Sequence, residues 1–102
     1  MLYYFSVRLL GTNLIGEFIR KHPDCENALR RWQKLITETN FRNIIELKKT
    51  FSTADAVDNK TVFNVGGNKI RTITVIEYGI AQVIITHVLT HKEYDQEKWK
   101  DE

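Results

Sequence analysis

Apolar and polar positions follow two different periods along the chain. Between residues 13 and 39 the apolar residues recur every three or four positions, which is the spacing of an amphipathic helix. From Thr61 to Thr90 the dominant period is two, as in half-buried strands. This separation predicts an α+β fold, with an N-terminal strand and a helical hairpin packed on one face of an antiparallel sheet.

The first half of the chain is expected to supply the N-terminal strand and the helices. Residues 2–10 are aromatic and aliphatic, which favours a strand, and Gly11 ends it. The second helix has the clearest apolar stripe, in which Trp32 is interpreted as a core residue. The expected elements are a strand over residues 2–10, a helix over 13–21 capped by Thr12, a break at His22-Pro23, a helix over 25–39 capped by Asp24, and a short helix over 40–51.

The second half is expected to form three strands joined by two tight turns. Gly66-Gly67-Asn68 supplies the positive φ angles that a hairpin needs. Because side chains two positions apart share a face of a strand, Ile85 and His87 are expected on the same face. The expected elements are a polar loop over residues 52–59, strands over 61–65, 69–78 and 82–90, and a second turn at 79–81.

The length of 102 residues indicates a single domain over residues 1–102. The formal charge of +2 is unevenly spread along it. Residues 1–92 hold 13 Lys and Arg against 8 Asp and Glu, whereas residues 93–102 hold 2 Lys against 5 acids. A basic body with an acidic tail suits a polyanionic partner.

Several classes of protein are disfavoured by the composition. Cys25 is the one cysteine, so no disulfide forms within the chain, and the His and Cys spacing does not suit a zinc site. We therefore expect neither a metal nor a cofactor. No apolar run approaches the ~20 residues of a membrane span, and the N-terminus lacks the features of a signal peptide. The expected compartment is the cytoplasm, with no membrane partner.

The richest set of proton-transfer and phosphate-binding groups lies at the strand ends and just after the last strand. Arg71 has apolar neighbours within its strand, so it must lie near a sheet end or meet an anion. His91 can exchange a proton near neutral pH, and Tyr94 is a natural proton donor. The candidate site consists of Lys48, Lys49, Lys69, Arg71, His91 and Tyr94, while His87 is interpreted as packed.

Each of these residues also has a purely structural interpretation. A solvated arginine at a strand end is as compatible with the sequence as one that binds an anion. A single His or Tyr in a small protein is more often structural than catalytic. Lys48-Lys49 is more often a solvated helix face than a phosphate contact.

Two motifs in this region resemble the HigB toxins of bacterial toxin–antitoxin modules, which belong to the RelE-like superfamily. They are VFNVGGNKIR at residues 62–71 and LTHKEYD at residues 89–95. His22-Pro23-Asp24, LKKTFSTAD at residues 47–55 and Lys98-Trp99-Lys100 also resemble the family. The resemblance covers roughly residues 8–100, and the first six residues extend beyond the usual start of the family.

The resemblance implies a small RelE-like domain with a cationic, concave sheet surface. It implies an mRNA interferase, an endoribonuclease that cleaves mRNA on translating ribosomes without a metal, by attack of a ribose 2′-hydroxyl on the adjacent phosphate. It also implies neutralisation by a HigA-type antitoxin with a helix-turn-helix domain, in a complex that is often heterotetrameric.

The resemblance gives each candidate residue a role in that reaction. Arg71 is expected to stabilise the charge added to phosphorus. Tyr94 is expected to be the general acid, and His91 either the base or the residue that orients Tyr94. Lys48, Lys49 and Lys69 are expected to hold phosphates.

The chain departs from the family at Thr86, where relatives often carry an arginine on the last strand. Loss of a second cation would weaken phosphate stabilisation. Two other functions are therefore considered: a non-catalytic toxin like the ParE-type members, which act on gyrase, and a generic RNA-binding domain. The nuclease hypothesis predicts that Arg71, His91 and Tyr94 converge in one solvent-open groove.

Overall fold

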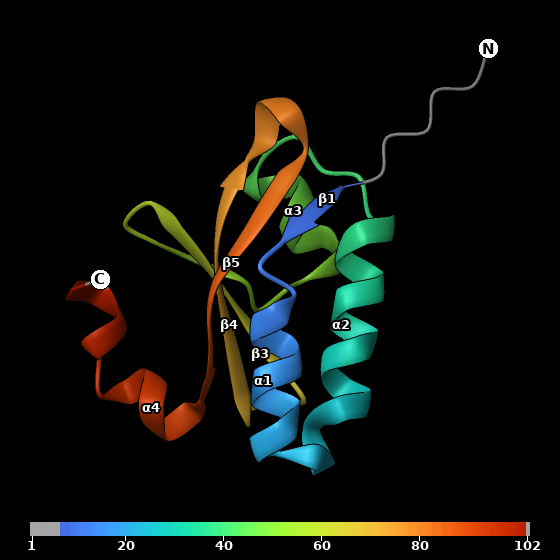
Figure 1. The fold of residues 1–102 in the computed structure, drawn as a ribbon. Coiled ribbons are helices and arrows are strands. Elements are labelled where there is room, and N and C mark those ends of the chain that lie inside the picture. The colour runs from blue at the N-terminus through green and yellow to red at the C-terminus, as the bar shows by residue number, and fades with distance from the viewer. Residues whose placement is uncertain (1–6, 102) are drawn as a thin grey trace.

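The computed structural model describes residues 7–101, which form one five-stranded sheet with helices on both sides (Figure 1). The residues 2–6 of the expected first strand lie outside this range. Three short 3-10 turns complete the described part, at Pro23–Cys25, Tyr78–Ile80 and Lys98–Asp101. The main elements are β1 (Arg8–Leu10), α1 (Asn13–Lys21), α2 (Glu26–Glu38), α3 (Ile44–Thr50), β2 (Asp55–Val57), β3 (Lys60–Val65), β4 (Ile70–Glu77), β5 (Gln82–Thr90) and α4 (His91–Asp95).

The strand order in the sheet is β1-β5-β4-β3-β2. Strands β2 to β5 form an antiparallel meander, while β1 pairs parallel to β5, with Arg8 opposite Gln82. The α+β class is confirmed, but the sheet is mixed rather than purely antiparallel. Parallel pairing needs a long crossover, and here everything between β1 and β5 provides it.

The predicted helical hairpin is present as α1 and α2, with α1 over the predicted residues. Pro23 ends the first helix as expected, but it starts a 3-10 turn, so α2 begins at Glu26. The N-cap of α2 is Cys25 rather than Asp24, and Thr12 caps α1 without a side-chain hydrogen bond.

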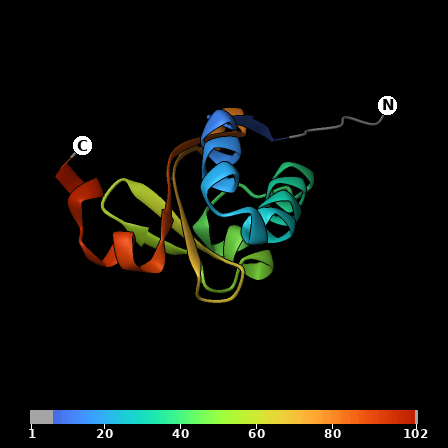
Figure 2. The ribbon, with the colours of Figure 1, turned by 60° about the horizontal axis from the view of Figure 1, so that its bottom comes forward.

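The main core lies between the sheet and helices α1, α2 and α3. Trp32 is 5% exposed and meets Phe63 of β3 edge-on, so its interpretation as a core residue is confirmed. Figure 2 shows α1 and α2 on one side of the sheet and α4 on the other. The largest fully buried side chains of this core include Ile15, Leu29, Ile36, Leu47, Phe63, Ile70 and Val83.

Two predicted elements differ from the structure, and the segment after the last strand forms a helix that was not predicted. The loop expected over residues 52–59 contains the edge strand β2, and the helix expected over 40–51 is shortened to α3. The segment after the last strand is α4, and a complete capping box lies at its N-terminus. Thr90 accepts a hydrogen bond from the Glu93 N–H, and the Glu93 carboxylate accepts one from the Thr90 N–H.

A β-bulge at Thr86 overturns the expected side-chain faces of β5. Ile73 pairs with His87 and the next residue, Thr74, pairs with Ile85, so Thr86 is the extra residue. The alternation of side chains restarts there. Ile85 therefore faces the helices, whereas His87 faces the other side, and the prediction that they share a face was wrong.

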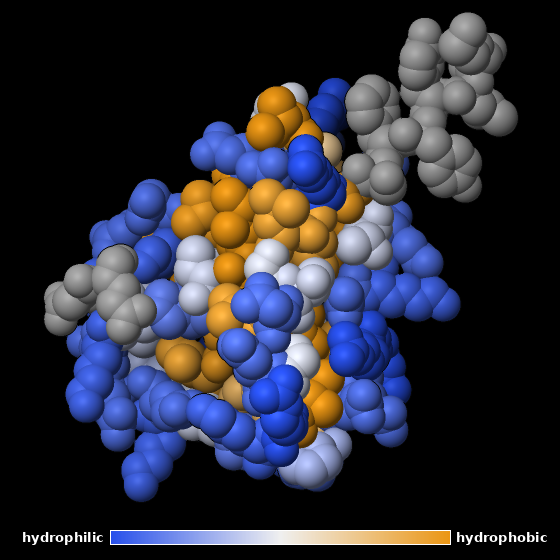
Figure 3. Space-filling view, in the orientation of Figure 1, coloured by the Kyte–Doolittle hydropathy of each residue, from blue (hydrophilic) through white to orange (hydrophobic). Residues whose placement is uncertain are grey.

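The surface is mostly polar, with one apolar band over β1 and β5 in the view of Figure 3. Polar side chains cover α2 and α4 on either side of this band. Within residues 7–101, no helix has the length and apolar character needed to cross a membrane.

Candidate active site on the distal face of the sheet

The sheet face turned away from α1, α2 and α3, called the distal face here, carries a second apolar cluster. Its buried members are Val62, Ile73 and Trp99, and Tyr94 packs against them. The C-terminal segment from α4 to Asp101 supplies Tyr94 and Trp99. It therefore covers the part of the distal face where β4 begins.

Arg71 lies on this face as the second residue of β4 and is only 7% exposed. Its Nη2 donates to Oδ1 of Asn68 at 2.6 Å. Its Nη1 contacts the backbone oxygens of Asn68 and Ile70 at 3.3 and 3.2 Å. The arginine thus lies near a sheet end, as expected, and its hydrogen-bond partners in the structure are neutral oxygens.

The ring of Tyr94 lies close to the guanidinium of Arg71, near the start of β4. The centre of the guanidinium is 5.5 Å from the centroid of the Tyr94 ring. The same ring stacks on Trp99, with centroids 5.1 Å apart and an interplanar angle of 13°. The indole Nε1 of Trp99 also donates to the Tyr94 carbonyl at 3.0 Å. The phenol therefore sits beside both a cation and a second aromatic ring.

His91 is the first residue of α4, and its N–H donates to the Lys69 carbonyl at 3.0 Å. Nδ1 of the His91 ring lies 3.3 Å from a carboxylate oxygen of Asp95, but the geometry of this contact is not that of a hydrogen bond. Because residues three apart lie on the same side of a helix, His91 and Tyr94 are neighbours on α4. The imidazole of His91 is 45% exposed, so this candidate catalytic side chain is open to solvent. Arg71, by contrast, is buried.

The candidate lysines are less closely grouped. Lys69 is exposed in the β3–β4 turn, and its carbonyl bonds to His91. Its charge lowers the pKa of the nearby Cys25 thiol, but burial and Asp24 outweigh it and raise that pKa overall. Lys48 and Lys49 are exposed in the last turn of α3, on the side of the sheet opposite Arg71.

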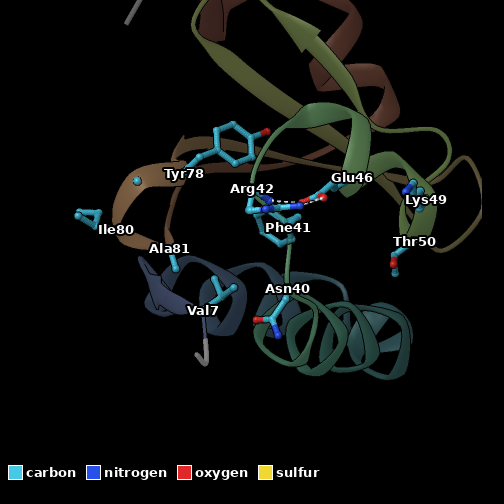
Figure 4. Close-up of a pocket in the computed structure, with 11 residues that line it drawn as sticks. Val7, Asn40, Phe41, Arg42, Glu46, Lys49, Thr50, Tyr78, Ile80 and Ala81 are labelled. Carbon is cyan, nitrogen blue, oxygen red and sulfur yellow. Dashed lines mark hydrogen bonds and ion pairs between the residues drawn. The ribbon is translucent and has the colours of Figure 1, made fainter. Parts of the chain in front are cut away.

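A cavity of about 780 Å³ lies at the opposite end of β4 from Arg71 (Figure 4). Arg42 and Glu46 form an ion pair at its wall, and hydrogen bonds from Arg42 lower the pKa of Glu46. Burial raises the pKa of the Tyr78 phenol, which lines the cavity. Lys49 also lines it, so the structure groups Lys49 with this cavity and not with Arg71.

The structure adds two residues that the choice of candidates missed. The sequence places Asn68 in the turn, yet its side chain holds the guanidinium of Arg71. Trp99 stands in the sequence only as part of a family motif, yet it stacks on Tyr94. An aromatic residue five positions after a candidate tyrosine, in a polar and charged tail, was the available signal. Among the side chains that the structure describes, no three His, Cys, Asp or Glu residues are grouped so that they could hold a metal ion.

The chain was compared with known protein families and curated proteins. A family described as "HigB_toxin, RelE-like toxic component of a toxin-antitoxin system" matches residues 25–97. This match includes β3, β4, β5 and α4, and therefore both Arg71 and Tyr94.

Individual relatives extend the similarity over most of the chain. The "mRNA interferase toxin HigB" of Escherichia coli K12 is 29% identical over 92 residues, which cover 87% of this chain and 88% of that protein. The "mRNA interferase HigB" of Shigella flexneri has the same identity and coverage. The protein of that name in Escherichia coli O6:H1 strain CFT073 is 31% identical over 83 residues, which cover 78% of this chain and 81% of that protein. This chain therefore belongs to the HigB toxin family, the RelE-like toxic components of toxin–antitoxin systems.

Proposed function

We propose that this chain is an endoribonuclease that cleaves mRNA, the activity for which its relatives are named. The observation that carries the proposal is the contact between Arg71 and Tyr94 on the distal face. The centre of the guanidinium lies 5.5 Å from the centroid of the phenol ring. A guanidinium can stabilise charge on a phosphate, and a phenol beside it can donate a proton.

The reaction we propose is an internal transesterification. The ribose 2′-oxygen attacks the adjacent phosphorus, a new O–P bond forms, and the bond from phosphorus to the 5′-oxygen breaks. The products are a 2′,3′-cyclic phosphate and a free 5′-hydroxyl. Arg71 stabilises the negative charge on the phosphate oxygens, and Tyr94 protonates the departing 5′-oxygen.

His91 accepts the proton of the 2′-hydroxyl in this proposal, or else orients Tyr94. Its Nδ1 faces the carboxylate of Asp95 at 3.3 Å. The other ring nitrogen, Nε2, is therefore the atom that would receive the proton. The exposure of the imidazole supports this role, because the nucleotide must reach it from solvent.

Arg71 must exchange partners before it can bind a phosphate. Two of its three hydrogen bonds go to Asn68, which lies in an exposed turn. A phosphate oxygen makes a stronger, charge-assisted bond than an amide oxygen does. We infer that substrate displaces the Asn68 side chain from Nη2 and takes its place.

The lysines have separate roles in this proposal. Lys69 follows Asn68 in the same turn and would hold the phosphate next to the cut. Lys48 and Lys49 lie on α3, across the sheet from Arg71, so they would contact only RNA that passes around the edge of the sheet. We propose further that the mRNA is bound to a ribosome, and that a HigA-type helix-turn-helix antitoxin neutralises the toxin in a heterotetramer.

The test is primer extension on a defined mRNA in a bacterial cell-free translation system, with and without stalled ribosomes. Wild type should give new 5′ ends that Arg71→Ala and Tyr94→Phe lose by about 100-fold or more. Matched controls are Arg31→Ala, which removes the same charge from an exposed face of α2, and Tyr78→Phe, which removes the same hydroxyl at the far end of β4. Both controls should cut normally.

Two further arms test the finer parts of the proposal. A single 2′-deoxynucleotide at the cleavage position should abolish the cut there, because the attacking hydroxyl is gone. Light scattering on the complex with a co-expressed antitoxin should give the mass of two toxins and two antitoxins. Cutting of the deoxy substrate would disprove internal attack, and absence of any cut by folded wild type would disprove the nuclease proposal.

The burial of Arg71 favours a second candidate, a non-catalytic toxin of the ParE type. A guanidinium that is 7% exposed and already hydrogen-bonded is poorly placed to meet RNA without rearrangement. This candidate predicts growth arrest that survives both Arg71→Ala and Tyr94→Phe, with intact mRNA in the arrested cells.

A further inference from the structure

We propose that Trp99 is a positioning residue, which holds the ring of Tyr94 against the guanidinium of Arg71. The inference rests on the proposed function, because it concerns the placement of a proposed proton donor. Its basis is the pair of contacts that the Tyr94 ring makes, one with Arg71 and one with Trp99.

The two aromatic rings are nearly parallel, with an angle of 13° and a centroid separation of 5.1 Å. This is an offset stack, an arrangement that aromatic pairs prefer. The indole N–H of Trp99 donates to the backbone carbonyl of Tyr94 at 3.0 Å. Trp99 therefore restrains both the ring and the backbone of the same residue.

Trp99 is itself anchored to the sheet. It is 3% exposed and packs against Val62 of β3 and Ile73 of β4. Lys60, also in β3, donates from Nζ to the Trp99 carbonyl at 3.3 Å and lies 5.5 Å from the centre of the indole. Nζ of Lys100 lies 5.6 Å from the same ring. The position of Trp99 is thus set by β3 and by β4, the strand that carries Arg71.

The chain reverses direction between the two aromatic residues to make this contact. Glu97 adopts a φ of +60°, a left-handed conformation that is uncommon for a residue with a Cβ. Its N–H donates to the Tyr94 carbonyl at 3.0 Å. The strained turn is what returns Trp99 to the ring of Tyr94, which indicates that the contact is built into the local fold.

Tyr94 needs such a restraint because its helix is short. Helix α4 has five residues, too few to be stable alone, and the capping box fixes only its first turn. A proton donor that is displaced by about 1 Å can lose about 100-fold in rate. The stack on Trp99 adds a contact to the ring itself, which α4 does not provide.

The test compares cleavage rates of Trp99 variants in two backgrounds. Trp99→Phe keeps an aromatic ring and loses the N–H, whereas Trp99→Met keeps most of the volume and loses the ring. The multiple-turnover rate at saturating ribosome–mRNA complex gives kcat, and the concentration for half-maximal rate gives KM. Each variant is measured with Tyr94 intact and with Tyr94→Phe.

With Tyr94 intact, we expect Trp99→Met to lower kcat about 10–100-fold with KM within about threefold, and Trp99→Phe to restore most of kcat. With Tyr94→Phe, the proton donor is already absent, so Trp99→Met should change kcat less than about twofold. The matched control is Trp32→Met, the other buried tryptophan, which faces the opposite core and should leave kcat of the folded protein unchanged.

Equal losses in both backgrounds would overturn the inference, since Trp99 would then act only on stability. Unchanged kcat in folded Trp99→Met would overturn it as well. If Trp99→Met does not fold, Lys60→Met loosens the anchor of Trp99 from the sheet and should lower kcat several-fold only when Tyr94 is present. A wild type that never cuts overturns the proposed function first, whereas an active wild type with a tolerant Trp99 overturns this inference alone.

Discussion

At the scale of single residues, the site depends on a buried cation that is held by neutral oxygens. The Arg71 guanidinium donates to both the backbone oxygen and the side-chain oxygen of Asn68. The 2.6 Å contact is short for a bond between nitrogen and oxygen, as expected for a charged donor. Asn68 thus keeps the cation extended over the start of β4.

Replacing Asn68 should cost stability, because a buried guanidinium would lose its shortest hydrogen bond. We expect Asn68→Ala to lower the free energy of unfolding by about 1–2 kcal/mol in urea denaturation. The control is Asn59→Ala in the turn between β2 and β3, which should change it by less than about 0.5 kcal/mol. Equal values for the two variants would show that Asn68 does not hold Arg71.

Two glycines should respond to alanine with opposite signs. Gly11 has a φ of +83°, and a Cβ there would lie 2.5 Å from the carbonyl oxygen of Ile85. Gly16 lies in α1, and a Cβ there would have no heavy atom within 4 Å. We expect Gly11→Ala to destabilise by about 2 kcal/mol or more, and Gly16→Ala to stabilise by about 0.5–1 kcal/mol. Thermal unfolding of the two variants side by side checks both signs.

The sequence indicates which residues could carry the chemistry of the site, but not which side chains they contact. Arg71 stood out because charge is costly inside a strand, and Tyr94 because it follows the strand end. Asn68 reads as an ordinary turn residue until the direction of its side chain is known. In the sequence, Lys49 is equivalent to Lys69 as a candidate cation. The packing of α3 places Lys49 on the side of the sheet opposite Arg71, which the sequence does not reveal.

At the scale of elements, the function proposed here depends on the start of α4. The capping box between Thr90 and Glu93 satisfies two N–H groups that a five-residue helix otherwise leaves free. Helix α4 carries both His91 and Tyr94, so its first turn sets their directions.

Removing the cap should affect cleavage more than overall stability. We expect Thr90→Val to cost about 1 kcal/mol in unfolding free energy, which leaves the core folded, and to lower the cleavage rate at least about tenfold. Thr53→Val, in an exposed loop, is the matched control and should change neither quantity. A Thr90→Val protein that cuts at the wild-type rate would show that α4 needs no cap.

Periodicity located most of the elements because their apolar faces are buried against one core. Residues 13–21 and 82–90 form a helix and a strand over the predicted range. The bulge at Thr86 escaped prediction, since an extra residue in a strand changes the face and not the composition. Strand β2 escaped because it is a three-residue edge strand with one partner, and α4 because the Thr90–Glu93 spacing was not recognised as a cap.

At the scale of the whole molecule, the sheet has a well-packed side and a thinly covered side. The central strand β4 is paired on both edges, and Thr72, Ile73 and Thr74 within it have no exposed surface. The distal face is covered by fewer residues, which come from one short C-terminal segment.

This difference predicts an uneven pattern of hydrogen exchange. Amides in the middle of β4 should exchange only through global unfolding, whereas those of α4 should exchange at least about tenfold faster through local opening. Exchange measured by mass spectrometry or NMR on the free toxin would show the two rates. Equal protection of α4 and β4 would mean that the C-terminal segment is as firmly held as the core.

The parallel pairing of β1 with β5 has a consequence for the newly made chain. Arg8 pairs with Gln82, 74 positions later. At synthesis rates of about 5–20 residues per second, the first strand waits about 4–15 s for its partner. The sheet cannot close until β5 has been synthesised, so each molecule passes this interval without a finished fold. Synthesis thus leaves a delay before a new toxin can act, during which an antitoxin translated nearby has time to fold.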